Sequence, residues 1–244
     1  MKRKKEKGFA LVLSIVLLLV MSLMGASLIV ISSGDHESNN VSDEYQQTFY
    51  VAEAGLLAGE RFLLDQYQGH WDLASDRRLD GRLPINEPDG SFWDGMMEAG
   101  NRINYTNLSG DEIFIMNTQN MCFNSFRSID THQFQVALDQ NGDRIAHSWN
   151  FGEFILDAYT FLGDPDLETE ANTLRPYIYE YFITRIGSTR FRGLGGSIKK
   201  EATDTELDGM AYRIYACGIY QGKEGDDGRG RMIVALESTM VVPK

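Results

Sequence analysis

The residues of this chain that could carry chemistry are two cysteines, four histidines, two acidic clusters and one glycine-rich segment. Two cysteines cannot build a cysteine-only zinc site, and they allow at most one intramolecular disulfide. The pair is Cys122 and Cys217, which are 95 positions apart. In an oxidising compartment we expect them to be bonded, with a stabilisation of about 4–5 kcal/mol from loop entropy. The alternative is two buried free thiols.

The two acidic clusters raise the question of calcium. Residues 139–143 (DQNGD) place oxygen ligands at alternating positions, as at the start of an EF-hand loop. The EF-hand position that needs glycine is occupied by Arg144, however, and the position that needs a bidentate glutamate is occupied by Asn150. The template therefore fails at both positions. Residues 164–170 (DPDLETE) match no loop template and suit a helix start. We therefore interpret the clusters as a solvated turn and a helix entry, with no metal bound.

Catalytic patterns are not evident in the remaining candidates. The four histidines, which fit no close metal-ligand spacing, are His36, His70, His132 and His147. The sequence has neither a GxSxG elbow nor a GxxxxGK[ST] loop. Residues 193–196 (GLGG) resemble a phosphate-binding loop only in composition, and a loop between strands is the simpler interpretation. We predict a protein that is not an enzyme and needs no cofactor.

The charge distribution argues against nucleic acid as a partner. The chain carries 23 basic and 35 acidic residues, a net charge of -12. Residues 1–7 hold five bases and one acid, so residues 8–244 hold 18 bases against 34 acids, a net charge of -16. An acidic body without a basic stripe repels phosphates, which makes a DNA or RNA binder an unsuitable hypothesis.

The N-terminal region predicts a membrane helix. Residues 9–31 (FALVLSIVLLLVMSLMGASLIVI) contain no charge and would span about 34 Å as a helix. The preceding basic cluster should stay in the cytoplasm, which places the residues after 31 outside. A cleavable signal would have a shorter apolar run, and a soluble core helix would show a polar face.

A second, amphipathic helix is expected after a polar segment. Residues 32–40 (SSGDHESNN) have poor helix propensity and predict a loose stretch. From residue 41 a stripe at helical spacing extends to about residue 67, where Gly69 can end the helix. The stripe consists of Tyr45, Phe49, Ala52, Leu56, Gly59 and Leu63. We expect it to pack against a sheet of the same chain. Contact with helices of partner proteins is an additional and compatible interpretation.

The head, residues 69–244, is clearest in its last third. Residues 177–186, 212–220 and 232–242 are rich in aromatic and β-branched side chains and predict three strands. A short strand is expected within 111–117, and the Asn-Gly pair between 133–138 and 144–148 predicts a hairpin. The predicted fold class is α+β, a long N-terminal helix packed on a C-terminal antiparallel sheet.

Two features of the first 65 residues resemble a known family. The junction Lys7-Gly8-Phe9 resembles a type IV prepilin signal, which implies cleavage between Gly8 and Phe9 by a prepilin peptidase. The alternative is an uncleaved signal anchor. Residues 49–61 (FYVAEAGLLAGER), at a fixed distance after the apolar helix, resemble the AEA-x-L-x-AGE signature of PilX-type minor pilins. The resemblance implies a pilin-like fold.

The fifth residue after the predicted cleavage site is Leu13, where major pilins usually carry glutamate. PilX-type proteins and the GspK-type pseudopilins of type II secretion commonly lack that acid. An acid in the bilayer needs a partner, and the amine of a neighbouring subunit would supply it. A chain with leucine there does not fit a bulk filament subunit.

The resemblance implies a structural role in type IV pilus assembly. The implied partners are other minor and major pilins, the inner-membrane assembly platform, the prepilin peptidase and a tip adhesin. The chain would reside in the bacterial inner membrane with its head in the periplasm, then in the pilus or at the cell surface, and would support adhesion or twitching motility. Methylation is the expected modification. Two alternatives are a GspK-like pseudopilin, whose helical insertion and calcium ligands are not evident here, and a signal-anchored periplasmic enzyme.

Overall fold

In the computed structural model the chain divides into two compact units, residues 1–46 and 47–244. The described residues are 6–69, 71–72, 74–78, 80–86, 103, 105–107, 110, 112–113, 121–127, 129, 134–159, 167–192, 206–222 and 231–244. The leader residues 1–5 and the glycine-rich segment 193–196 lie outside them.

Helix α1 (Glu6–Gln68) supplies all of the described structure of the first unit and continues into the second. The polar segment 32–40, expected to be loose, is helical without a break. The difference has a physical reason. Propagating an existing helix adds one hydrogen bond per residue, and weak helix formers such as serine and asparagine cost only tenths of a kcal/mol each, roughly. The helix ends at Gln68, and Gly69 follows with φ of 85°, as a C-terminal glycine does.

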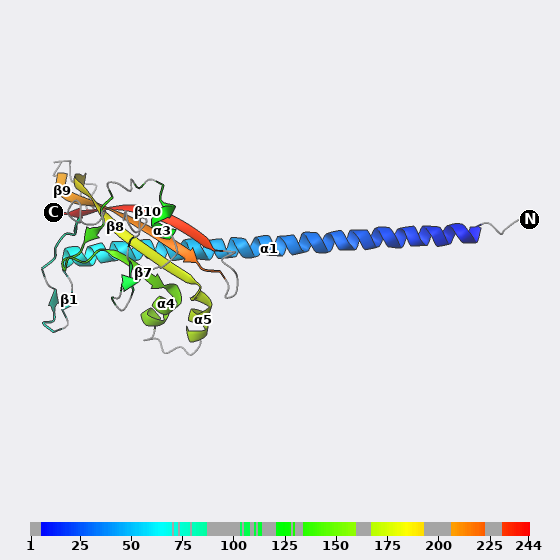
Figure 1. Ribbon diagram of the computed structural model, residues 1–244, viewed down its shortest axis with the longest axis horizontal. Coiled ribbons are helices and arrows are strands. Elements are labelled where there is room, and N and C mark those ends of the chain that lie inside the picture. Colours follow the sequence, from blue (N-terminus) through cyan, green and yellow to red (C-terminus); the bar gives the residue numbers. More distant parts are fainter. Residues whose placement is uncertain are drawn as a thin grey trace, which may run out of the picture. The chain divides into compact units, whose positions relative to one another are not determined.

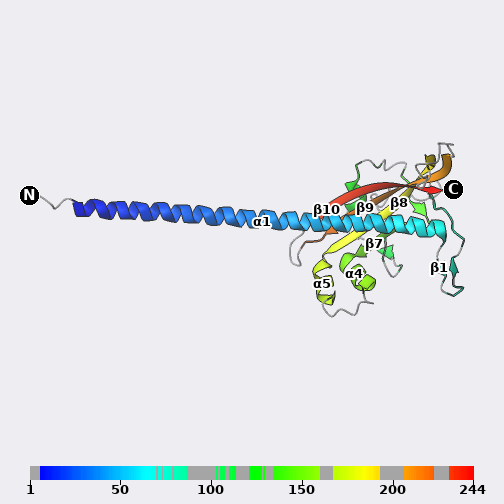
Figure 2. The same cartoon turned by 180° about the vertical axis from the view of Figure 1, so that it is seen from behind.

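The second unit is built on a six-stranded sheet of order β10-β9-β8-β7-β4-β5. Its strands are β4 (Tyr105–Thr106), β5 (Glu112–Ile113), β7 (Ala146–Asn150), β8 (Tyr177–Arg192), β9 (Glu206–Tyr220) and β10 (Met232–Pro243). All neighbours are antiparallel except β4 and β7. In Figures 1 and 2 the part of α1 from residue 47 onward lies along β8, β9 and β10.

Smaller elements surround this sheet. The helices are α3 (Met121–Ser125), α4 (Phe151–Tyr159) and α5 (Leu167–Leu174). Two further antiparallel pairs are β1 (Trp71–Asp72) with β2 (Arg77–Arg78), and β3 (Ile85–Asn86) with β6 (Ala137–Leu138).

The α+β class is confirmed, and so are the three C-terminal strands. Strands β8 and β9 extend beyond the predicted limits because β8 continues through a bulge between Arg185 and Gly187. The predicted hairpin turn is present, since the Asp139 amide donates to the Asp143 carbonyl at 2.8 Å. Its two arms then diverge: β6 pairs with β3, whereas β7 pairs with β8.

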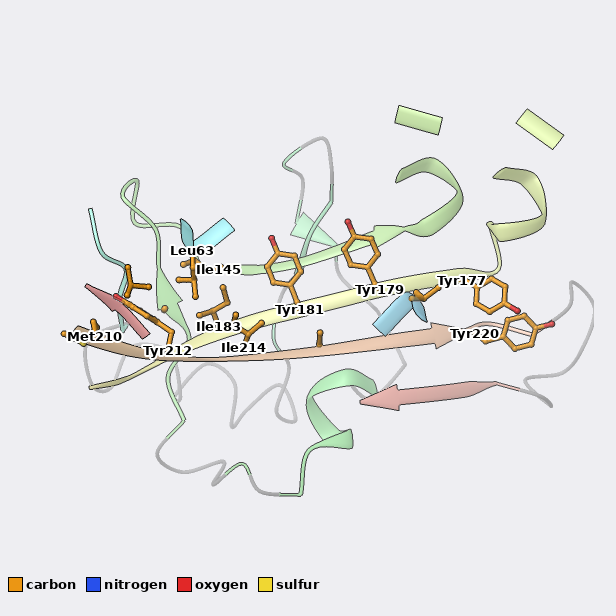
Figure 3. Packing of buried hydrophobic residues seen from close by; sticks show 14 residues of the cluster. Leu63, Ile145, Tyr177, Tyr179, Tyr181, Ile183, Met210, Tyr212, Ile214 and Tyr220 are labelled. Atoms are coloured by element: carbon orange, nitrogen blue, oxygen red, sulfur yellow. The ribbon is translucent and has the colours of Figure 1, made fainter. Parts of the chain in front are cut away.

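The sheet separates two cores. One face of the sheet is covered by α1. Figure 3 shows that Tyr179 and Tyr181 project from the same side of β8 into the core on this face. On this face Tyr177 and Tyr220 stack with ring centroids 4.9 Å apart. The opposite face holds α3, and its core contains both cysteines and a group of phenylalanines. We call these the helix face and the disulfide face.

Candidate assembly helix and the sheet beneath it

The buried side of α1 follows a line slightly offset from the predicted stripe. Its buried positions between residues 48 and 66 recur with each helical turn and are Thr48, Val51, Ala52, Gly55, Gly59, Leu63 and Gln66. Of the predicted stripe, Ala52, Gly59 and Leu63 are buried on the head's own sheet, Phe49 and Leu56 are half-buried, and Tyr45 is exposed. The helix therefore contacts the sheet mainly through small residues.

Glycines on both partners let the helix backbone lie directly on strand β9. A Cβ added at Gly218 would be 2.0 Å from the carbonyl oxygen of Thr48 and 2.8 Å from the amide nitrogen of Ala52. From the helix side, a Cβ at Gly59 would be 2.7 Å from Cγ2 of Ile214. One at Gly55 would be 3.3 Å from Cβ of Ala216. Any side chain at Gly218 or Gly59 would push the helix off the sheet.

We call this close contact between α1 and β9 the seam. The sequence contained a signal for it. Two Ala-Gly pairs, 54–55 and 58–59, recur at a spacing of four within the block 49–61. A spacing of four places both glycines on one side of a helix. The sequence prediction included Gly59 but missed Gly55 and Gly218, because it was based on large apolar residues.

Polar contacts fix how α1 is turned on the sheet. The Tyr177 hydroxyl donates to Oε1 of Gln47 at 2.5 Å. The Ser238 hydroxyl donates to Oε1 of Glu60 at 2.9 Å, so this flank of the helix faces β10. On the other flank the Phe62 ring lies 5.3 Å from the ring of His147 on β7.

The side of α1 that points away from the sheet carries a second apolar stripe. Tyr50, Leu57 and Leu64 are spaced seven residues apart and are 63%, 65% and 39% exposed. Seven residues are nearly two helical turns, so the three side chains form one line. The head itself does not bury this line, and an apolar heptad spacing suits contact with another helix.

Between residues 11 and 31, α1 carries no charged side chain and is apolar on all sides. The large hydrophobic side chains between Leu11 and Ile31 are exposed, including Leu13 at 55%. The hydroxyls of Ser14 and Ser27 donate to the carbonyls of Leu11 and Met24, at 2.8 and 2.9 Å, and so are satisfied within the helix. Among the described residues this one helix is long and apolar enough to cross a membrane. Gly8 and Phe9, the predicted processing residues, lie within its first turn.

On the disulfide face, Cys122 of α3 is bonded to Cys217 of β9, with sulfurs 2.09 Å and Cα atoms 5.6 Å apart. This is the pairing expected from the two cysteines of the sequence. Aromatic rings surround the bond: Tyr215 lies 4.8 Å from Phe126 and 5.0 Å from Phe182, measured between centroids. The bond holds a five-residue helix against the sheet.

The same face contains a buried acid that the sequence analysis missed. Glu180 of β8 is 2% exposed, and its Oε1 accepts a hydrogen bond of 3.3 Å from the Ser148 hydroxyl. Burial raises the pKa of Glu180 to about 7, although the Ser148 hydrogen bond acts in the opposite direction. The only sequence signal was an acid within the apolar strand YIYEYF.

His147 lies half-buried on the helix face. Its ring lies 5.2 Å from the ring of Tyr181, and its Nδ1 is 2.9 Å from the Thr106 hydroxyl. Burial lowers the pKa of His147 to about 4, with nearby Asp139 opposing the shift, so the ring is neutral at pH 7. No group of three or more His, Cys, Asp or Glu side chains in the described part of the chain is arranged to hold a metal ion.

The acidic clusters have structural roles where the structure describes them. The Asp139 carboxylate accepts hydrogen bonds from the amides of Asn141 and Asp143, at 2.8 and 2.9 Å, and thereby closes its own turn. Glu168 and Glu170 lie in the first turn of α5, where the helix dipole favours acids. Residues 164–166, His70 and His132 lie outside the described residues.

Comparison with family models, curated proteins and solved structures finds no match. The functional assignment therefore depends on the residues and the geometry of this chain.

Proposed function

We propose that this chain is a PilX-like minor pilin that takes part in a priming or tip complex for type IV pilus assembly. The observation that carries the proposal is that the two parts of α1 have different surfaces. An apolar stretch suited to a bilayer is followed, in the same helix, by a seam of small residues that packs on an antiparallel sheet. The prepilin-like junction at Gly8 and the block 49–61 agree with this arrangement.

Assembly contacts are assigned to the two apolar surfaces of α1. The stretch Leu11–Ile31 would anchor the subunit in the inner membrane, with its head in the periplasm, before extraction into a filament. The outward line of Tyr50, Leu57 and Leu64 would contact helices of other minor or major pilins. Ala52, Gly59 and Leu63 are already used by the head's own sheet and would act indirectly.

Leu13 supports the proposal that the subunit is present at low copy number. In a bulk subunit, an acid at this position would neutralise the N-terminal amine of a neighbour inside the apolar filament core. Leu13 cannot do so, and an unpaired charge in such surroundings is costly. A shaft would repeat that cost at every subunit, whereas a tip subunit avoids it. The assembly platform, the prepilin peptidase and a tip adhesin complete the proposed set of partners.

The test compares filaments from cells that carry wild-type protein, a deletion, Leu57→Glu or Thr169→Glu. Both substitutions add one acid at an exposed position, but Thr169 lies on α5. We expect the deletion to reduce the number of pili, Leu57→Glu to reduce incorporation of a folded protein, and Thr169→Glu to behave as wild type. Immunogold labelling should give rare particles at filament ends. Dense, regular labelling along the shaft, or a secretion defect with normal pili, would contradict the proposal.

A further inference from the structure

The two edges of the main sheet are protected very differently. One edge is β5, which has two residues. The other is β10, which has twelve residues and, among the described residues, pairs only with β9. A long edge strand presents a row of unpaired amides and carbonyls, which is a template for another strand.

Strand β10 lacks the sequence devices that usually prevent such pairing, although α3 contacts it on the disulfide face. Its register with β9 is continuous from Met232 to Pro243, without a bulge. Its sequence, MIVALESTMVVP, contains no lysine or arginine, and proline occurs only at the last position. A short strand, a lysine, an internal proline or a bulge would each block an added strand. Only Glu237 interrupts the apolar run with a charge.

The flank of α1 above this edge is incompletely covered. The hydrogen bond from Ser238 to Glu60 shows which flank faces β10. Leu56, four residues before Glu60, lies on the same flank and is half-buried, and so is Phe49 one heptad earlier. A strand added about 4.8 Å beyond β10 would continue the sheet below this flank. Its side chains would then cover Leu56 and Phe49.

The charges around the edge select the occupant. Glu53 and Glu60 lie on the α1 flank, and Glu237 is exposed on the opposite side of β10. By register the closest base is Arg213, which pairs with Thr239 across β9 and β10. Arg231 and Lys244 lie just outside the two ends of β10, so it is along the middle of the strand that three acids against one base favour a strand with lysine or arginine. A second copy of this chain, itself at -12, is disfavoured.

We propose that the free edge of β10 binds an extended segment of a partner polypeptide, in which apolar residues alternate with positions that include lysine or arginine. The apolar residues would face Leu56 and Phe49, a base would lie opposite Glu237, and backbone hydrogen bonds would continue the ladder. The proposal goes beyond the pilus assignment and does not depend on it.

The test uses the full chain in lipid nanodiscs and a synthetic 12-residue peptide, TVKVTVKVTVKV, as the probe. Binding is measured by fluorescence anisotropy, and amide exchange is followed by mass spectrometry. The first matched probe has glutamate in place of lysine, and the second carries N-methyl groups on alternate amides. We expect the lysine probe to slow exchange in residues 232–243, the glutamate probe to bind about fivefold more weakly, and the methylated probe not to bind.

A charge swap then localises the contact. Glu237→Lys should weaken the lysine probe about fivefold and strengthen the glutamate probe. The control Glu168→Lys makes the same charge change on α5 and should alter neither preference. The proposal is overturned if exchange in 232–243 of the wild-type chain does not respond to the lysine probe. It is also overturned if both variants weaken that probe equally, or if nanodiscs without peptide contain a dimer joined through β10.

Discussion

The two faces of the central sheet are covered by elements of very different length, and they are fastened by different means. On the helix face, the 47–68 part of α1 rests on β9 through Gly218, Gly55 and Gly59, without a covalent link. On the disulfide face, α3 has five residues and is bonded to β9 through Cys122–Cys217. A long helix buries enough surface to stay docked, whereas one turn of helix does not. The disulfide compensates for the short element.

The faces also differ in the ionisable group that each one buries. The disulfide face holds Glu180, whose pKa burial raises to about 7. The helix face holds His147, whose pKa burial lowers to about 4. Burial therefore favours the protonated, neutral form of Glu180 below pH 7 and the neutral form of His147 above pH 4, because an apolar core disfavours either sign of charge. Stability should therefore respond to pH in opposite directions at the two faces.

The largest expected effect comes from removing the covalent link. The double variant Cys122→Ala, Cys217→Ala should lose about 4–5 kcal/mol of unfolding free energy, because 95 residues separate the cysteines and the unfolded chain gains loop entropy. Urea denaturation of the head, followed by tyrosine fluorescence, gives the difference. A loss below about 1 kcal/mol would show that the aromatic packing around α3 suffices without the bond.

The seam on the helix face should be the next most sensitive. Gly218→Ala places a methyl group 2.0 Å from the Thr48 carbonyl oxygen, so the helix backbone must move. We expect a loss of about 3 kcal/mol, the upper end of ordinary overpacking. Gly34→Ala is the control, since a Cβ there meets nothing within 4 Å. Equal denaturation midpoints for Gly218→Ala and wild type would contradict the close-approach account.

The last third of this head could be predicted from the sequence, whereas α3, α4 and the parallel pair of β4 and β7 could not, and the seam was predicted only in part. The strands of the last third were evident because β-branched and aromatic residues are concentrated there. Phe49 and Leu56 of the predicted stripe are only half-buried, because helical spacing fixes a stripe only to within about one residue in each turn. Which neighbouring line is buried was decided by Gly218, which is 159 positions away from Gly59 in sequence and unrelated to helix periodicity.

The buried ionisable groups show a second limit. Glu180 and His147 lie on strands with correctly expected positions, yet their neutral state depends on elements that cover each face. Ser148, which hydrogen-bonds Glu180, comes from β7, and Phe62, which covers His147, comes from α1. Periodicity within one strand cannot supply such cross-element contacts.

The pH response is the smallest net effect, because two opposite contributions nearly cancel. Between pH 4.5 and 7, folded Glu180 keeps a proton that unfolded glutamate releases, so stability falls by about 3 kcal/mol as pH rises. Between pH 4 and 6.5, unfolded histidine binds a proton that folded His147 does not, so stability rises by a similar amount.

Single substitutions should separate the two contributions. As pH rises from 4.5 to 6.5, the unfolding free energy of Glu180→Gln should increase relative to that of wild type. The unfolding free energy of His147→Phe should decrease relative to wild type over the same range. Each change should amount to at most about 1.4 kcal/mol per pH unit. Urea unfolding at pH 4.5, 5.5 and 6.5 measures both slopes against the wild-type background. Parallel curves for the three proteins would mean that neither group is held neutral by burial.

The most direct test of the proposed pilin identity is the mass of the mature N-terminus. Protein purified from cells with active prepilin peptidase should begin at Phe9, whereas protein from peptidase-deficient cells, or the Gly8→Val variant, should keep residues 1–8. Intact mass spectrometry resolves the difference of eight residues without ambiguity. An intact Met1 terminus in wild-type protein, in the presence of active peptidase, would contradict the prepilin assignment and support an uncleaved signal anchor.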